Sequence, residues 1–134
     1  MDRQFDVLYG YLALAKRPGK SGPALEDRTR FLVRQLAADR SGCRWCIEHA
    51  RHDWRVQGLP VDLLRELGRH ETSDAFTDRE RAALALVDSV ACARAGAGAT
   101  GEALTQLRGL YSEHAVAELI ACMAEHHLIA DDHP

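Results

Sequence analysis

The segment SGCRWCIEH, residues 41–49, decides how this chain of 134 residues is organised. Its Ser41-Gly42 pair interrupts one amphipathic pattern, and a second pattern with helical spacing starts at Cys43. Serine and glycine are typical of a helix boundary, where the free amides of the first turn need partners. Cys43 and Cys46 are three residues apart and therefore share one face of the predicted helix.

Two thiols at the start of a helix have the arrangement of a redox-active dithiol. The free amides and the dipole of a helix N-terminus stabilise a thiolate and lower its pKa, and Arg40 and Arg44 add positive charge nearby. We predict that Cys43 is the more exposed thiol, that Cys46 is the more buried one, and that the pair cycles between dithiol and disulfide. His49, three residues after Cys46, is the candidate to exchange a proton with that thiol.

Two other interpretations of the cysteine pair stay open. A zinc site would take its four donors at intervals of three residues, from Cys43, Cys46, His49 and His52. Three residues fall about 60° short of a full helical turn. Over the three steps from Cys43 to His52 the direction changes by about 180°, so these two side chains would face opposite sides of the helix. The two cysteines could instead pack as small hydrophobic side chains at the helix start. We predict no metal and no cofactor, since the sequence has no phosphate loop, flavin motif or haem motif.

Outward from this segment, the spacing of apolar residues predicts an all-α fold, a helical bundle of six or seven helices. The predicted helices cover residues 6–16, 24–38, 43–56, 61–67, 77–93, 102–110 and 112–129. Thr77-Asp78-Arg79-Glu80 is a capping box that starts the longest internal helix. Residues 17–23 hold two prolines and two glycines and are predicted to be a loop, and residues 131–134 are predicted to be a frayed tail.

The composition is 46% hydrophobic and 28% charged, with a net charge of −3. We predict that residues 1–134 form a single domain, which at this length can bury a core without disulfides. The absence of a basic cluster argues against nucleic-acid binding, and charges interrupt each long apolar stretch, so no membrane span is expected. The polar, acidic beginning of the chain is unlike a signal peptide, which favours a cytoplasmic protein.

Other residues invite a functional interpretation but fit a structural one. Cys92 and Cys122 lie among apolar residues of helical patterns, and we predict that both belong to the core. His114 and Glu118 are four residues apart and could pair, most simply on a helix surface or at a subunit contact. Trp54 is expected to serve packing rather than to bind a cofactor.

Residues 41–49 resemble the redox motif of the alkylhydroperoxidase D-like proteins, which belong to the carboxymuconolactone decarboxylase superfamily. Two further segments carry the same resemblance. Residues 76–84, FTDRERAAL, are similar to the family's F-[ST]-x-x-E-x-A-A-L opening of a long helix, and residues 111–119, YSEHAVAEL, are similar to the start of its last helix. Together these segments extend the resemblance over most of the chain, from residue 5 to residue 130.

The resemblance implies an all-helical fold that assembles into trimers or hexamers, and thiol-dependent reduction of peroxides. In that scheme a thiolate attacks the peroxide, the second cysteine condenses with the resulting sulfenic acid, and a dithiol protein or small thiol reduces the disulfide. The two cysteines carry over directly to Cys43 and Cys46. The alternative is a non-enzymatic protein, a redox sensor or structural oligomer whose cysteine pair does not turn over peroxide.

The family's proton relay matches this chain less closely. The relay histidine stands four residues after the second cysteine, where this chain has Ala50. His49 is one residue earlier, a spacing that also occurs among relatives in the superfamily. The family's upstream glutamate stands twelve residues before the first cysteine, where this chain has Phe31. The resemblance therefore implies an altered relay around an intact dithiol.

Overall fold

The structure, a computed structural model, describes residues 6–15, 25–94 and 101–125. These ranges form seven helices without a strand: α1 (Asp6–Ala15), α2 (Asp27–Ser41), α3 (Arg44–Val56), α4 (Asp62–Leu67), α5 (Asp78–Arg94), α6 (Gly101–Arg108) and α7 (Glu113–Glu125). The predicted all-α class is confirmed, and the helix boundaries that fall on described residues lie within a few residues of those predicted. The predicted end of the last helix at residue 129 lies outside the described residues. The predicted loop at 17–23 and the predicted tail at 131–134 lie outside the described residues.

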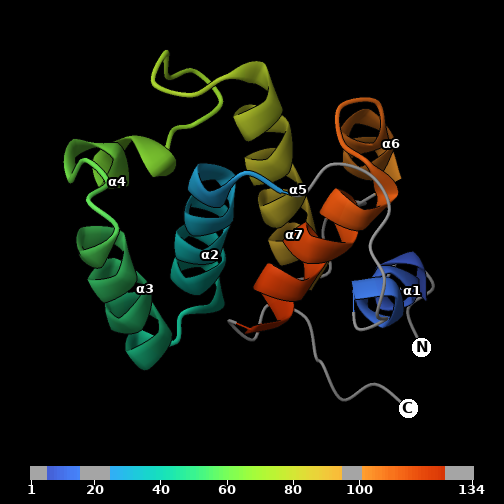
Figure 1. Ribbon diagram of the computed structural model, residues 1–134, viewed down its shortest axis with the longest axis horizontal. Helices are drawn as coiled ribbons and strands as arrows, with labels where there is room; N and C mark the ends of the chain where they lie inside the picture. The colour runs from blue at the N-terminus through green and yellow to red at the C-terminus, as the bar shows by residue number, and fades with distance from the viewer. Residues whose placement is uncertain (1–5, 16–24, 95–100, 126–134) are drawn as a thin grey trace.

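Helix α2 lies in the middle of the arrangement, where it packs against α3, α5 and α7. Helices α1 and α6 lie on one side of α2, α5 and α7, and α3 and α4 lie on the other side (Figure 1). Helix α7 also packs against α1, and α5 packs against α6. The α2–α3 junction, which holds residues 41–43, is therefore at the flank of the bundle. None of the helices in the described ranges is long and apolar enough to cross a membrane.

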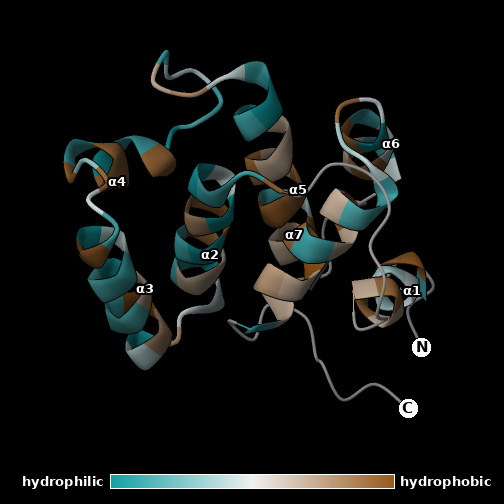
Figure 2. Cartoon of the chain, in the orientation of Figure 1, coloured by the Kyte–Doolittle hydropathy of each residue, from teal (hydrophilic) through white to brown (hydrophobic). Residues whose placement is uncertain are grey.

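The core is built mainly by α2, α5 and α7, which turn large apolar side chains toward one another. Fully buried examples are Leu32, Leu36, Leu84, Ile120 and Met123. Each such burial contributes about 1.5–3 kcal/mol relative to an exposed side chain. Helix α3 differs, because most of its length is hydrophilic (Figure 2), and it buries Cys46, Ala50 and Trp54 along one stripe.

Local sequence signals set the helix ends. The backbone N–H of Glu80 donates to Thr77 Oγ1 at 3.1 Å, and the N–H of Thr77 donates to Glu80 Oε1 at 2.9 Å, which is the predicted capping box. Gly58 has a φ of 74° just after α3, a conformation that suits glycine at a helix end. Trp54 is buried as predicted, and its indole N–H donates to the carbonyl of Pro60 at 2.9 Å.

The two cysteines predicted to lie in the core differ in the structure. Cys122 is buried on α7, as predicted, and burial raises the pKa of its thiol to about 11. Cys92 is exposed, so this prediction is wrong. The physical reason is helical phase. Cys92 follows the buried Val90 by two residues, or about 200° around α5, and so faces away from the core.

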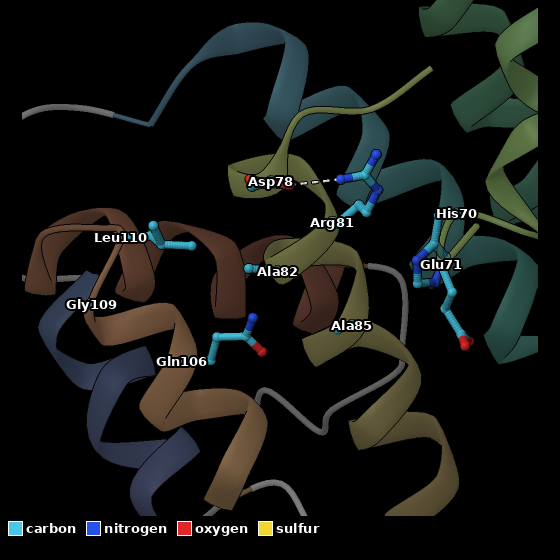
Figure 3. A pocket seen from close by; sticks show the side chains of 9 residues that line it. All are labelled: His70, Glu71, Asp78, Arg81, Ala82, Ala85, Gln106, Gly109 and Leu110. Carbon is cyan, nitrogen blue, oxygen red and sulfur yellow. Dashed lines mark hydrogen bonds and ion pairs between the residues drawn. The ribbon is translucent and has the colours of Figure 1, made fainter. Parts of the chain in front are cut away.

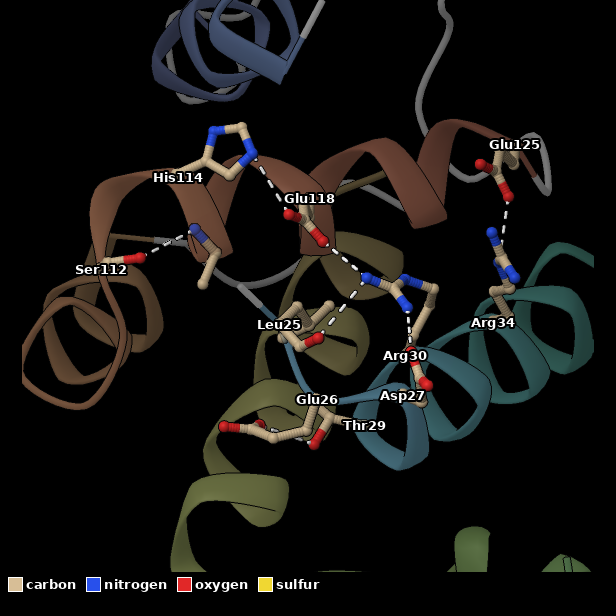
Figure 4. A network of polar contacts seen from close by, with 11 residues as sticks. Leu25, Glu26, Asp27, Thr29, Arg30, Arg34, Ser112, His114, Glu118 and Glu125 are labelled. Atoms are coloured by element: carbon tan, nitrogen blue, oxygen red, sulfur yellow. Dashed lines mark hydrogen bonds and ion pairs between the residues drawn. The ribbon is translucent and has the colours of Figure 1, made fainter. Parts of the chain in front are cut away.

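The pair of His114 and Glu118 is also placed differently from the prediction of a helix-surface contact. Both side chains are buried or nearly so, with exposed fractions of 4% and 13%, and His114 Nε2 is 3.2 Å from Glu118 Oε1. Glu118 also binds Arg30 of α2, whose Nη2 lies 2.7 Å from Oε2 (Figure 4). The pair lies inside because α2 packs over this face of α7 and supplies the opposite charge.

Candidate active site

The two thiols meet where α2 ends and α3 begins. Gly42 ends α2 with a φ of 71°, in the left-handed region that strains other residues. Cys43 then takes an extended conformation and is the N-cap of α3, with its N–H donating to Ser41 Oγ at 3.3 Å. Ser41 and Gly42, the residue types expected at a helix boundary, therefore lie just before the cap. Cys46 therefore lies in the first turn of the helix.

The sulfur of Cys43 takes the place of a capping oxygen. Its Sγ accepts a hydrogen bond from the backbone N–H of Cys46 at 3.3 Å. The pKa of the Cys43 thiol is lowered from its usual value of 9.0, first by a hydrogen bond from the Cys46 thiol and then by backbone N–H groups. A helix N-terminus and a neighbouring thiol therefore stabilise a thiolate at Cys43.

Cys46 has the opposite environment. Its side chain is fully buried and packs against Ala38 of α2 and Ala50 of α3. Burial raises the pKa of the Cys46 thiol to about 11, and its hydrogen bond to Cys43 adds to the rise. Cys46 thus keeps its proton and shares it with Cys43. Both cysteines are free thiols in this structure, and the predicted contrast between an exposed and a buried sulfur is confirmed.

His49 lies on the outer side of α3, with 48% of its side chain exposed. Its ring stacks on the indole of Trp45, with centroids 4.9 Å apart and planes 6° from parallel. Its Nε2 is 3.7 Å from Asp53 Oδ2. These described contacts of the imidazole do not include a sulfur atom. The role of His49 in proton transfer therefore stays a prediction.

The four donors of the zinc interpretation do not converge in the described part of the chain. Cys43 and Cys46 point to one another, whereas His49 contacts Trp45 and Asp53. His52 is exposed one turn further along α3. A single continuous helix separates these side chains, as the three-residue drift predicts.

Phe31, at the position of the family's upstream glutamate, is half-buried, and the Arg34 guanidinium lies 5.8 Å from its ring centroid. Helix α2 carries a different carboxylate nearer the dithiol. Asp39 follows Ala38 directly, its pKa is raised by burial, and Gln35 Nε2 donates to its Oδ1 at 3.0 Å. The sequence analysis missed this pair, although its four-residue spacing on one helix was a signal.

A second polar cluster also escaped the sequence analysis. His70 is buried in the connection between α4 and α5, and its Nε2 lies 2.6 Å from Asp88 Oδ2. Arg40 Nε, near the end of α2, donates to the other oxygen of Asp88 at 2.7 Å. Asp88 is 18 positions from His70 and 48 from Arg40, and the three residues belong to separate elements. Such distant positions form no motif that could be recognised in the sequence.

Comparisons with known proteins agree with this architecture. No protein-family model matches the chain, and no curated protein matches it. Among solved structures, the chain superposes with a TM-score of 0.59 on a protein of unknown function from Agrobacterium tumefaciens described as a "Putative Antioxidant Defence Protein AhpD". The two chains are 24% identical, and the match covers 98% of this chain and 91% of the other. The likeness shows an AhpD-like helical fold.

Proposed function

We propose that this protein is a thiol-dependent antioxidant oxidoreductase that reduces peroxides through a Cys43–Cys46 dithiol–disulfide cycle. The observation that supports the proposal most directly is that the pKa values of two neighbouring thiols are shifted in opposite directions. The pKa of Cys43 is lowered and its sulfur is accessible, whereas Cys46 is buried with its pKa raised to about 11. The AhpD-like fold supports the same reaction class, since the A. tumefaciens protein with this fold is described as acting in antioxidant defence.

The first step uses the Cys43 thiolate as the nucleophile. Its sulfur attacks one peroxide oxygen, the O–O bond breaks, and Cys43 becomes a sulfenic acid while the other oxygen leaves as an alkoxide or hydroxide. That leaving group must take up a proton. We assign this proton transfer to His49 acting through solvent water, because its ring is exposed one turn beyond Cys46 and contacts Trp45 and Asp53.

The second step forms the disulfide. The Cys46 sulfur attacks the sulfenic sulfur of Cys43, and the hydroxyl leaves as water with the proton that Cys46 gives up. The hydrogen bond between the two thiols supports this step, because the sulfurs are already in contact in the reduced protein. The buried position of Cys46 also protects its thiol from reacting with solvent-borne oxidants before the sulfenic acid forms.

The third step regenerates the dithiol. An external thiolate attacks the disulfide at Cys43, whose sulfur is the accessible one, and forms a mixed disulfide. The Cys46 sulfur leaves and takes up a proton. A second thiolate, from the same dithiol or from a second small-thiol molecule, then attacks the mixed disulfide and releases Cys43 as the thiolate. We propose a dithiol protein or small thiol as this reductant, and an assembly of this chain into trimers or hexamers, as the family resemblance implies. The length and the polar, acidic beginning of the chain support a single-domain cytoplasmic protein.

Peroxide consumption in the presence of a dithiol reductant tests the cycle. We expect Cys43→Ser to abolish turnover. Cys46→Ser should still form the sulfenic acid at Cys43, which dimedone traps as an adduct seen by mass spectrometry. Cys92→Ser is the matched control, because Cys92 is exposed but lies on α5. Equal turnover by the parent protein and Cys43→Ser would refute the proposal.

A redox sensor is the second candidate, and the described contacts of His49 favour keeping it. The imidazole is engaged with Trp45 and Asp53 rather than with a sulfur. A sensor would form one Cys43–Cys46 disulfide per chain with peroxide and change its oligomer size or its binding partner. It would not consume further peroxide when a dithiol is supplied, so the same assay separates the two functions.

A further inference from the structure

Within the described ranges, the buried His70 has one ring nitrogen that is paired and one that lacks a hydrogen-bond partner. Only 2% of the residue is exposed, and Nε2 lies 2.6 Å from Asp88 Oδ2. An ionised carboxylate can only accept, so Nε2 is the donor of this pair, and a neutral imidazole in this tautomer has its lone pair at Nδ1. Among the described residues, Nδ1 has no hydrogen-bond partner although it is shielded from solvent. An unpaired buried polar atom of this kind calls for an unseen water or ion.

The next residue along the chain supplies a second donor. Glu71 is exposed, and ligand atoms of His70, Glu71 and Asp88 lie within 4.8 Å of one another. Two donor atoms that each lie about 2.1 Å from one metal ion are at most about 4.2 Å apart. One donor atom of each residue therefore already lies close to this range, and the exposed Glu71 side chain is free to rotate toward the imidazole.

Both carboxylate oxygens of Asp88 already have a partner. Oδ1 accepts from Arg40 Nε at 2.7 Å, and Oδ2 is paired with His70 Nε2. The arginine balances its charge and leaves it suited to orient the imidazole rather than to bind an ion itself. A carboxylate that holds the far nitrogen of a metal-binding histidine is the usual support of such a ligand.

A pocket of about 570 Å³ opens beside the two donors. His70 and Glu71 lie on one side of it, and Ala82, Ala85 and Gln106 of α5 and α6 form other parts of its wall (Figure 3). The pocket has room for the water molecules that would complete the coordination of an ion held by two protein ligands.

We propose that His70 Nδ1 and the Glu71 carboxylate bind a first-row divalent cation, for which Zn²⁺ is the probe, with Asp88 as the positioning residue. The donor set of imidazole and carboxylate suits Zn²⁺ and its first-row neighbours. This site is separate from the dithiol and does not depend on the peroxide cycle.

Zinc titration by calorimetry tests this site, in a background that removes the competing thiols. The full chain carrying Cys43→Ser, Cys46→Ser and Cys92→Ser is the parent, since the dithiol and the exposed Cys92 thiol can themselves bind zinc. We expect one ion per chain in the parent and at least tenfold weaker binding after Glu71→Gln. His70→Gln should abolish binding, and Asp88→Asn should weaken it by about 10- to 100-fold.

The matched control is Glu48→Gln with His52→Gln, which removes an exposed carboxylate and an exposed histidine from α3. It should bind zinc like the parent. Circular dichroism checks whether His70→Gln and Asp88→Asn fold. If either does not, the comparison with Glu71→Gln tests the proposal, because the exposed Glu71 side chain can be replaced without disturbing the core. Equal binding by the parent and by Glu71→Gln would overturn the proposal. So would the absence of binding by the parent at about 100 µM Zn²⁺, which corresponds to a dissociation constant well above that concentration.

Discussion

The α2–α7 interface and the α2–α3 junction both depend on α2, yet they use polar chemistry in different ways. At the α2–α7 interface, Arg30 joins Asp27 and Glu118, and Glu118 also reaches His114. At the α2–α3 junction, the described environment of the two sulfurs is backbone amides, alanine side chains and one another. Ionised side chains hold helices together in the first region, whereas burial and helix geometry create reactivity in the second.

The difference shows how helix position and a second thiol, rather than an ionised side chain, lower the pKa of Cys43 among the residues that the structure describes. The hydrogen bond from Cys46 is the largest cause of the lowered pKa of Cys43, and the amides of the first turn of α3 come next. The same short segment raises the pKa of Cys46 by burying it. Two residues one turn apart thus acquire opposite character from their position on a single helix.

The largest expected effect is the difference in alkylation between the two thiols. The pKa of Cys46 is about 11 and that of Cys43 is below 9.0, so at pH 8 their thiolate populations differ by more than about a hundredfold. We expect iodoacetamide to modify Cys43 at least about a hundredfold faster, because burial of Cys46 offsets its greater intrinsic nucleophilicity. Peptide mass spectrometry over time measures both rates.

The pH profile sharpens the same contrast. Each rate rises as its thiol ionises, so the Cys43 profile should have its midpoint below pH 9 and the Cys46 profile near pH 11. In Cys46→Ala the hydrogen bond from the second thiol is lost, and the Cys43 midpoint should move upward. A midpoint for Cys43 that is unchanged in Cys46→Ala would show that the helix amides alone set its pKa.

A smaller effect is expected on stability when the α2–α7 network is cut. Glu118→Gln should lower the free energy of unfolding by about 2 kcal/mol, because Arg30 and His114 lose a charged partner that is largely shielded from water. Urea denaturation measures this loss. The control is Glu48→Gln on α3, whose exposed pair with Arg51 is 3.7 Å long and should contribute less than about 0.5 kcal/mol. Equal losses from both variants would remove the distinction between the regions.

The smallest expected effect concerns His49. Because its ring contacts Trp45 and Asp53, we expect His49→Gln to lower peroxide turnover by less than about tenfold, below the usual range for a directly acting general acid. His52→Gln, on the same exposed helix, serves as the control and should leave turnover unchanged. A fall of a hundredfold in His49→Gln alone would show that the imidazole leaves Trp45 and reaches the reacting atoms during the cycle.

The sequence predicted the helices well because their ends are marked by residues with strong local preferences. Gly42, Gly58 and the capping box from Thr77 to Glu80 act within a few residues and need no information about tertiary contacts. The contrast between Cys43 and Cys46 follows from the same local logic, since both positions relate to one helix start.

Features that depend on packing between distant segments were not predictable in this way. Helix α7 has small apolar residues on most of its circumference, so its pattern does not reveal that Glu118 faces α2. Cys92 lies near the end of α5, where a difference of two residues separates a buried side from an exposed one. The contacts of Asp88 with His70 and Arg40 join three elements and leave no periodic trace in the sequence.

The different exposure of the two tryptophans has a practical consequence for observing the protein by fluorescence. The chain contains two tryptophans, Trp45 and Trp54, and they lie on the same helix in opposite environments. Trp45 is 70% exposed and sits between Cys43 and Cys46 in the sequence, whereas Trp54 is fully buried with its indole N–H bonded to Pro60. Acrylamide should therefore quench the fluorescence of Trp45, which lies beside the dithiol. The fluorescence of the buried Trp54 should resist quenching and report on folding.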